Sequence, residues 1–371
     1  MSCRNQSSRI PAWTVALPII VGILWIGTAP DEARARKELL TAEEKALLGR
    51  VERVHLETLV LTSRGPAETP PLTRTAAARL EQLGYVIVVD GNAPSDVTVK
   101  IKCEESKTWE GTGQSGGDAD SVDAAARLWK GPACQISYRI GTQNTDWRHE
   151  VRAAKTSGQN SSKKSGDADS GNAAISALLD QLRHDDFPYL LAAEWGQLNR
   201  LLTSLESPGI DKSKKLRLIG LIGSMQSEHA VPRLTTLLKD SDPDVAGAAA
   251  TALGTVGEAV CIPPLLSLMA SDRPNQRHAA AIGLGRLAPL YPNSEIVPTM
   301  LKALPREPVP TQILIVRALG KTTDRRILEP LRTLHRSVLK RPPGEMTPEL
   351  TELKTTLGIA LDQFDGTHTE E

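Results

Sequence analysis

The feature that most constrains the fold is a repeat in the C-terminal half of the chain. From about Leu191 to Phe364 the sequence repeats a small tripeptide that ends in Gly and, alternating with it, an apolar or acidic residue followed by Pro. The glycines are Gly223, Gly254, Gly285, Gly320 and Gly358, and the prolines are Pro232, Pro263, Pro298 and Pro330. Their intervals are 31, 31, 35 and 38 residues for Gly and 31, 35 and 32 for Pro, so the two series advance in step. A repeat of this length predicts an all-α solenoid of about five helix pairs over residues 191–364.

Both markers have a physical reason. Proline fits the first turn of a helix, where its missing N–H would have no partner in any case. Glycine lets successive helices approach closely. The only aromatic residues of this region are Trp195, Tyr291 and Phe364, so its core must be built from Leu, Ile, Val and Ala. Such amphipathic pairs cannot bury their apolar faces alone, and several must therefore stack.

The stretch Ala230–Val245, followed by Ala248–Gly254, resembles the HEAT-repeat family, and specifically the short bacterial subtype also found in phycobilin lyases. The resemblance covers about 170 residues, and Ala246 stands where the family usually has Arg. It implies a protein-binding surface along the second helices of the pairs. On that surface we expect Asp244, Gln276, Arg277, Gln312 and Arg317 to contact a partner. Reversing Arg277 and Arg317 to Glu should then weaken partner capture and leave the stability nearly unchanged, as for exposed residues.

The first 35 residues have the character of an export segment. Arg4 and Arg9 precede an uncharged run, residues 10–30, which is long enough to span a bilayer as a helix. Small residues at Ala33 and Ala35 would allow cleavage as a signal peptide. Both readings, cleaved signal peptide and retained transmembrane anchor, remain open. In either case we expect the rest of the chain to be exported, either periplasmic or anchored in the inner membrane and facing the periplasm.

Residues 36–190 read as an α+β domain. Apolar residues alternate with polar ones at Val54–Thr58, Val97–Cys103, Cys134–Ile140 and Trp147–Ala153, which is typical of half-buried strands. Helices are expected over Leu72–Leu83, Ala124–Trp129 and Ala173–Leu182. The order predicts a mixed or antiparallel sheet with helices on one face. The layout loosely resembles small domains of envelope lipoproteins and assembly factors.

Cys103 and Cys134 lie on consecutive predicted strands with the same parity as their apolar neighbours. In an oxidising compartment they could form a disulfide, and two buried free thiols are the alternative.

Two loops of this domain share a Gly, Asp and Ser rich phrase, at residues 117–125 and 166–174. We interpret both as flexible loops whose side chains cap the helix that follows. The alternative is a Ca²⁺ site, but the loops lack the third carboxylate, the central Gly and the terminal Glu of a helix-loop-helix site. The last residues, 365–371, are expected to be a disordered tail.

No catalytic constellation stands out. Ser115 lies in a G-x-S-x-G match without the flanking buried strand and helix that a nucleophile elbow needs. His149 and Glu150 form a single His-Glu pair on a predicted strand, and His229, His278 and His335 lack a neighbouring carboxylate, so we expect no metal and no other cofactor.

Basic and acidic residues balance at 44 each, which argues against nucleic-acid binding. The leading hypothesis is a protein-protein interaction scaffold of the cell envelope, with no small-molecule substrate and with membrane contact through an uncleaved N-terminal segment. One alternative is an envelope enzyme with its site in the α+β domain, at Ser115, Asp118, Asp120 or His149. Another is a purely structural envelope component.

Overall fold

The computed structural model describes residues 40–89, 91, 93–111, 127–153 and 167–365. From Leu40 onward the chain forms one compact unit. The predicted export segment, Ser115, Asp118, Asp120 and residues 366–371 of the tail lie outside the described residues. Within the described residues, no helix has the length and apolar character needed to cross a bilayer.

An α+β region opens the described chain. Helix α1 (Ala42–Leu48) begins at a capping box, in which Thr41 and Glu44 bond each other's backbone. The remaining elements are β1 (Arg53–Thr62), β2 (Gly65–Pro66), α2 (Pro70–Glu81), β3 (Val86–Val88), β4 (Val97–Gly111), β5 (Arg127–Ile140), β6 (Gln143–Asn144), β7 (His149–Arg152) and α3 (Asp167–His184). The strands form a seven-stranded sheet with the order β2-β1-β4-β5-β6, in which β3 also pairs with β1 and β7 with β5.

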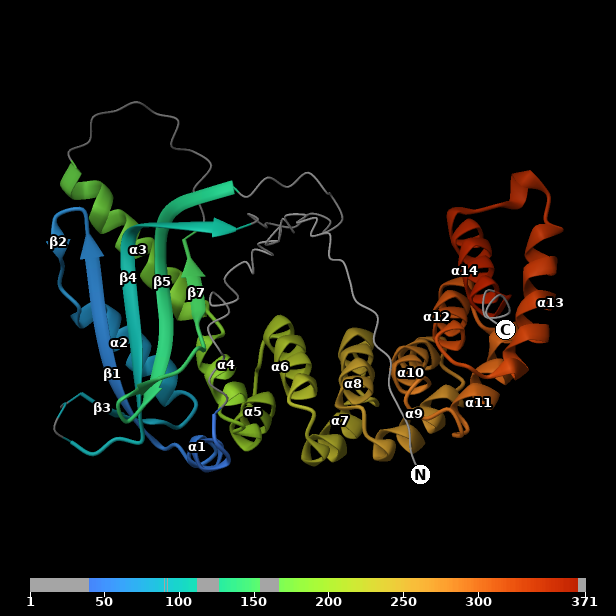
Figure 1. The fold of residues 1–371 in the computed structure, drawn as a ribbon, viewed down its shortest axis with the longest axis horizontal. Helices are drawn as coiled ribbons and strands as arrows, with labels where there is room; N and C mark the ends of the chain where they lie inside the picture. Colours follow the sequence, from blue (N-terminus) through green and yellow to red (C-terminus); the bar gives the residue numbers. More distant parts are fainter. Residues whose placement is uncertain (1–39, 90, 92, 112–126, 154–166, 366–371) are drawn as a thin grey trace, which may run out of the picture. The chain divides into compact units, whose positions relative to one another are not determined.

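The sheet is mixed, which confirms the α+β prediction. Strand β1 runs parallel to β3 and β4, whereas β5 runs antiparallel to β4 and β7. Alternation places Val54, Val99 and Ile136 on the buried face, which α2 and α3 cover (Figure 1). Cys103 lies opposite Cys134 in the register of β4 and β5, and a disulfide with an S–S distance of 2.07 Å joins them.

Two boundaries in this region differ from the sequence prediction. The helix expected over Ala124–Trp129 is wrong at its described end, because Arg127–Trp129 continue strand β5 and Trp129 pairs with Trp109 of β4. The helix expected from Ala173 begins at Asp167, so part of the second Gly, Asp and Ser rich stretch is helical. Local composition favoured a helix at the first place and a loop at the second, but long-range strand pairing and helix propagation prevail.

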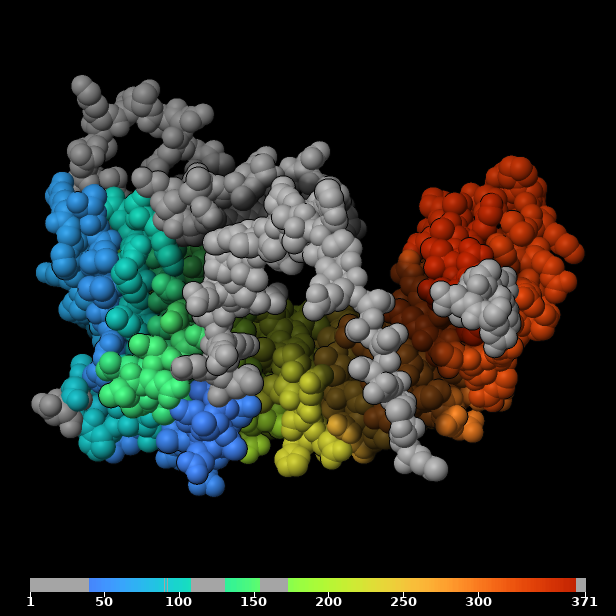
Figure 2. Space-filling view, in the orientation of Figure 1, coloured from blue at the N-terminus to red at the C-terminus, as the bar shows by residue number. Residues whose placement is uncertain are grey.

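The remaining described residues, up to 365, are mainly helical and confirm the predicted pairs. A first helix, α4 (Phe187–Glu194), is followed by the pairs α5 (Leu198–Leu205) with α6 (Lys212–Ser224), α7 (Val231–Leu237) with α8 (Pro243–Val256), α9 (Ile262–Met269) with α10 (Pro274–Leu287), α11 (Ile296–Ala303) with α12 (Val309–Gly320), and α13 (Leu328–Leu339) with α14 (Pro348–Asp365). The second helices contact one another in sequence order, α6 with α8, α8 with α10, α10 with α12 and α12 with α14. Figure 2 shows the pairs as successive bands of colour.

The repeated glycine sits where these second helices meet. A Cβ on Gly223 of α6 would lie 2.8 Å from the Cα and Cβ of Ala252 on α8, which is too close for any real pair of carbons. Gly358 of α14 has no such neighbour within 4 Å. The repeated glycine therefore allows a close contact between the second helix of one pair and that of the next. In the last pair no further described helix follows, so Gly358 has no such contact.

Candidate functional site

The α+β region and the first repeat helices are joined by a buried polar network. Gln197, at the start of α5, donates from Nε2 to the carbonyl oxygens of Leu48 and Val51, at 2.9 Å each, and accepts at Oε1 from the Tyr85 hydroxyl at 2.6 Å. Arg200 donates to the carbonyls of Leu83, at 2.6 Å, and Val51, at 3.3 Å. Burial raises the pKa of Tyr85, so its hydroxyl stays a neutral donor. Each of these polar groups is satisfied across the junction, which fixes α5 against the sheet region.

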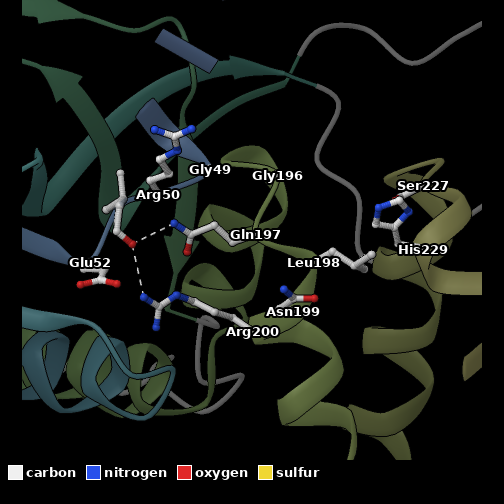
Figure 3. Close-up of a pocket in the computed structure, with 11 residues that line it drawn as sticks. Gly49, Arg50, Glu52, Gly196, Gln197, Leu198, Asn199, Arg200, Ser227 and His229 are labelled. Carbon is white, nitrogen blue, oxygen red and sulfur yellow. Dashed lines mark hydrogen bonds between the residues drawn. The ribbon is translucent and has the colours of Figure 1, made fainter. Parts of the chain in front are cut away.

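Figure 3 shows the cavity beside this network, which has a volume of about 330 Å³. Arg50, Asn199 and His229 line it together with Gln197 and Arg200. The side chains of Gln197 and Arg200 donate their hydrogen bonds to main-chain oxygens of the junction, not to groups in the cavity. We therefore regard this cavity as part of the junction between the two regions.

A second hollow has the chemistry of a protein-binding groove. Two cavities of about 310 and 410 Å³ adjoin between α4 and α6 and share Leu190, Leu221 and Ser224. The first continues to Tyr189 and Leu218, and the second to Ala193, Met225 and Trp147–His149. We call this feature the α4–α6 groove. Its floor is aliphatic and aromatic, as expected of a site that buries apolar side chains of a ligand.

The rim of the α4–α6 groove is charged. Lys214 lies over the Tyr189 ring, with Nζ 4.9 Å from the ring centroid, and has no carboxylate partner among the described residues. Arg217 pairs with Asp186 at 2.7 Å. Within the described residues, Arg148 donates to two main-chain oxygens, those of Thr145 and Trp147. Lys214 and Arg148 therefore have no ion-pair partner among the described residues, although the exposed carboxylate of Glu194 also lines the groove beside Arg148.

His149 is held at the far end of the α4–α6 groove. Its Nε2 lies 2.8 Å from Oδ1 of Asp185, its ring stacks on Trp147 with centroids 6.3 Å apart, and the same Asp185 oxygen accepts from the backbone N–H of Phe187. This arrangement ties β7 to the segment that begins α4. The neighbouring Glu150 bonds Lys107 at 2.7 Å on the sheet, so the expected His-Glu pair does not face a common site.

Two of the five predicted contact residues are not exposed as expected. Arg277 donates to Oε1 of Glu307 at 2.7 Å, and the side chains of Arg277 and Glu307 are only 12% and 0% exposed. Gln312 is buried and donates to the carbonyl of Leu304. The expectation of an exposed position is wrong for both, because Arg277 pairs with a buried carboxylate of the next helix pair and Gln312 bonds a main-chain oxygen within its own pair.

The other three predicted residues have partners within the chain. Asp244 accepts from Lys212 at 2.7 Å, Arg317 donates to Glu352 at 2.6 Å, and Gln276 accepts from Ser271. Asp242 and Asp244 together raise the pKa of Lys212 to about 12. Asp244 and Arg317 remain exposed, so these two can still contact a partner. The structure does not bring the five residues into one site.

The groove residues escaped the sequence prediction because α4 precedes the first recognisable repeat and the first unit has no Pro marker. An uncompensated Lys214 next to the aliphatic run of α6 is the one signal that could have pointed to them. Among the described residues, no group of three or more His, Cys, Asp and Glu side chains could hold a metal ion. His278 is half-buried, and its Nδ1 lies 2.9 Å from the Thr311 hydroxyl.

Comparison with known proteins agrees with the repeat. Residues 199–285 match the family model for HEAT repeats. No curated protein matches the chain. The match spans helices α5 to α10, so the comparison identifies HEAT repeats in the first three helix pairs of the helical region.

Proposed function

We propose that this HEAT-repeat protein is a protein-binding scaffold of the cell envelope, and that it holds a segment of its partner in the α4–α6 groove. The observation that carries the proposal is the combination of an aliphatic floor at Leu190 and Leu221 with the rim cations Lys214 and Arg148, which form no ion pair within the described residues. Such a groove suits a peptide segment that places apolar side chains on the floor and carboxylates at the rim.

The repeat supports this proposal in general terms. HEAT-type stacks present an extended surface along their second helices, and α6 contributes both to that surface and to the α4–α6 groove. Asp244 and Arg317, which are exposed on α8 and α12, could extend the contact beyond the groove.

An envelope location is part of the proposal. The basic residues Arg4 and Arg9 before an uncharged run support export, and a disulfide at Cys103 and Cys134 would persist in an oxidising compartment. A reporter fused after Leu48 should be active only outside the cytoplasm. The enzyme alternative rests on Ser115, Asp118 and Asp120, which lie outside the described residues, and on His149, which is bound to Asp185.

Site-specific photo-crosslinking in native membranes tests the scaffold proposal. A photoreactive residue at Leu221 in the groove should give one partner adduct, identified by mass spectrometry. The matched control is Leu339 on α13, an exposed leucine outside the groove. Equal adducts at both positions, or none at Leu221 with a strong one at Leu339, would contradict the proposal.

A further inference from the structure

A separate basic cleft lies between α2 and α3, on the α+β region. Its volume is about 450 Å³. It is lined by Pro71, Arg74, Thr75, Ala78, Arg79, Gln82 and Arg183. The α2 residues recur at intervals of three and four and therefore share one helix face. Three guanidinium groups line this α2–α3 cleft, and no carboxylate does.

Arg79 forms the fixed floor of the α2–α3 cleft. More than nine-tenths of the residue is buried, Nη1 donates to Gln82 at 2.7 Å, and Nη2 donates to the carbonyl of Asp185 at 2.5 Å. The Tyr189 ring lies 6.0 Å from its Cζ. Its Nε is buried without a hydrogen-bond partner. A buried cation that bonds only neutral oxygens keeps its full charge, which acts on the cleft through a poorly screening interior.

Arg74 and Arg183 are the two exposed arginines of the α2–α3 cleft, and their side chains can extend toward a bound anion. Arg74 is exposed and has no carboxylate partner within the described parts of the chain. Arg183 pairs with Asp180 of its own helix, but both side chains are more than half exposed. An exposed pair of this kind is worth little, so an incoming anion can readily replace Asp180. The three positive charges around this cavity repel one another, and an anion bound between them offsets that repulsion.

We propose that the α2–α3 cleft binds a phosphate group, either as free phosphate or as the headgroup of an anionic phospholipid. Arginine presents its N–H groups in a planar fork that matches phosphate oxygens, and the cleft is lined by Arg74 and Arg79 from α2 and by Arg183 from α3. Thr75 and the amide nitrogen of Gln82 add neutral donors at the same face. The cleft is larger than a phosphate ion, which leaves room for an ester substituent.

The test compares two double variants of the full chain that lose the same charge. Arg74→Gln with Arg183→Gln removes the two exposed guanidinium groups of the cleft. Arg64→Gln with Arg325→Gln removes two exposed arginines elsewhere and serves as the control. Calorimetric titration with inorganic phosphate at low salt measures free anion binding. Co-sedimentation with vesicles of phosphatidylglycerol, compared with phosphatidylcholine, measures headgroup binding.

We expect saturable binding by the unmodified protein in at least one of the two assays. The cleft variant should weaken it by at least about tenfold, and the control variant should leave it nearly unchanged. Binding of phosphate alone identifies a free anion, and binding of phosphatidylglycerol vesicles identifies a headgroup. Equal loss in both variants, which would indicate general charge attraction, or no saturable binding in either assay, would overturn the proposal. Unchanged thermal midpoints establish that both variants fold.

Discussion

Replacing Arg277 with Ala should destabilise the repeat region far more than replacing any exposed arginine. The change leaves the Glu307 carboxylate, whose side chain is 0% exposed, without its 2.7 Å partner, and the other oxygen of that carboxylate already has no hydrogen-bond partner. Arg306 lies 3.8 Å away, beyond hydrogen-bond distance. Breaking a buried ion pair on one side costs about 3–5 kcal/mol, and the nearby Arg306 charge favours the lower end of that range.

The assay is urea unfolding followed by helix circular dichroism, with Arg317→Ala as the matched control. Arg317 pairs with Glu352, but both side chains are about half exposed, so its removal should cost less than about 1 kcal/mol. Replacing Arg277 by Met and Glu307 by Leu together should recover most of the loss, because no charge then remains buried. A loss for Arg277→Ala within about 0.5 kcal/mol of the Arg317→Ala loss would refute this reasoning.

Three further predictions concern the contact between stacked helices, the Lys215–Asp240 ion pair and the disulfide. Gly223→Ala should lower the free energy of unfolding by about 1–3 kcal/mol in the same assay, because the added Cβ would overlap Ala252. Gly358→Ala should be neutral or stabilising by up to about 1 kcal/mol, because nothing in the described chain lies near that position. Equal effects of the two variants would mean that the contact at Gly223 is not tight. Hydrogen bonding from Lys215 lowers the pKa of Asp240, so the pair stabilises the fold while Asp240 is ionised. Lys215→Met should therefore lower the free energy of unfolding above about pH 4, and this loss should vanish as the pH falls through the lowered pKa. A loss that does not depend on pH would argue against the pairing. Thiol counting in denaturant without reductant should find one free thiol, Cys261, in a chain cleaved after Ala35, and three would exclude the disulfide.

The parts of the fold that sequence could predict are those encoded locally. Pro at the first turn and Gly at the helix contact mark the middle pairs, and the alternation around Val99 and Ile136 marks strands and their buried face. The α+β order followed from these elements alone. Strand β5 includes Trp129 because this residue pairs with Trp109 of β4, which is distant in sequence. The residues around Trp129 alone do not indicate that pairing.

The candidate site was less predictable for a related reason. Arg277 reads as a surface residue of an amphipathic helix, and its burial becomes evident only when Glu307, thirty residues later, is packed against it. The α4–α6 groove combines α4, α6 and the Trp147–His149 segment, which are distant in sequence. Periodicity within one helix indicates which face is apolar, but it does not indicate which apolar residues a neighbour leaves uncovered.

The most direct test of the central claim is the affinity of the crosslinked partner segment for groove variants of the intact chain. Leu221→Gln alters the floor of the α4–α6 groove, and Leu339→Gln alters an exposed apolar residue of α13 outside it. We predict that Leu221→Gln raises the dissociation constant of the segment by at least about tenfold, as loss of a central apolar contact does, and that Leu339→Gln leaves it within about twofold. Unchanged affinity for Leu221→Gln in a folded protein, with or without an effect of Leu339→Gln, would contradict the account.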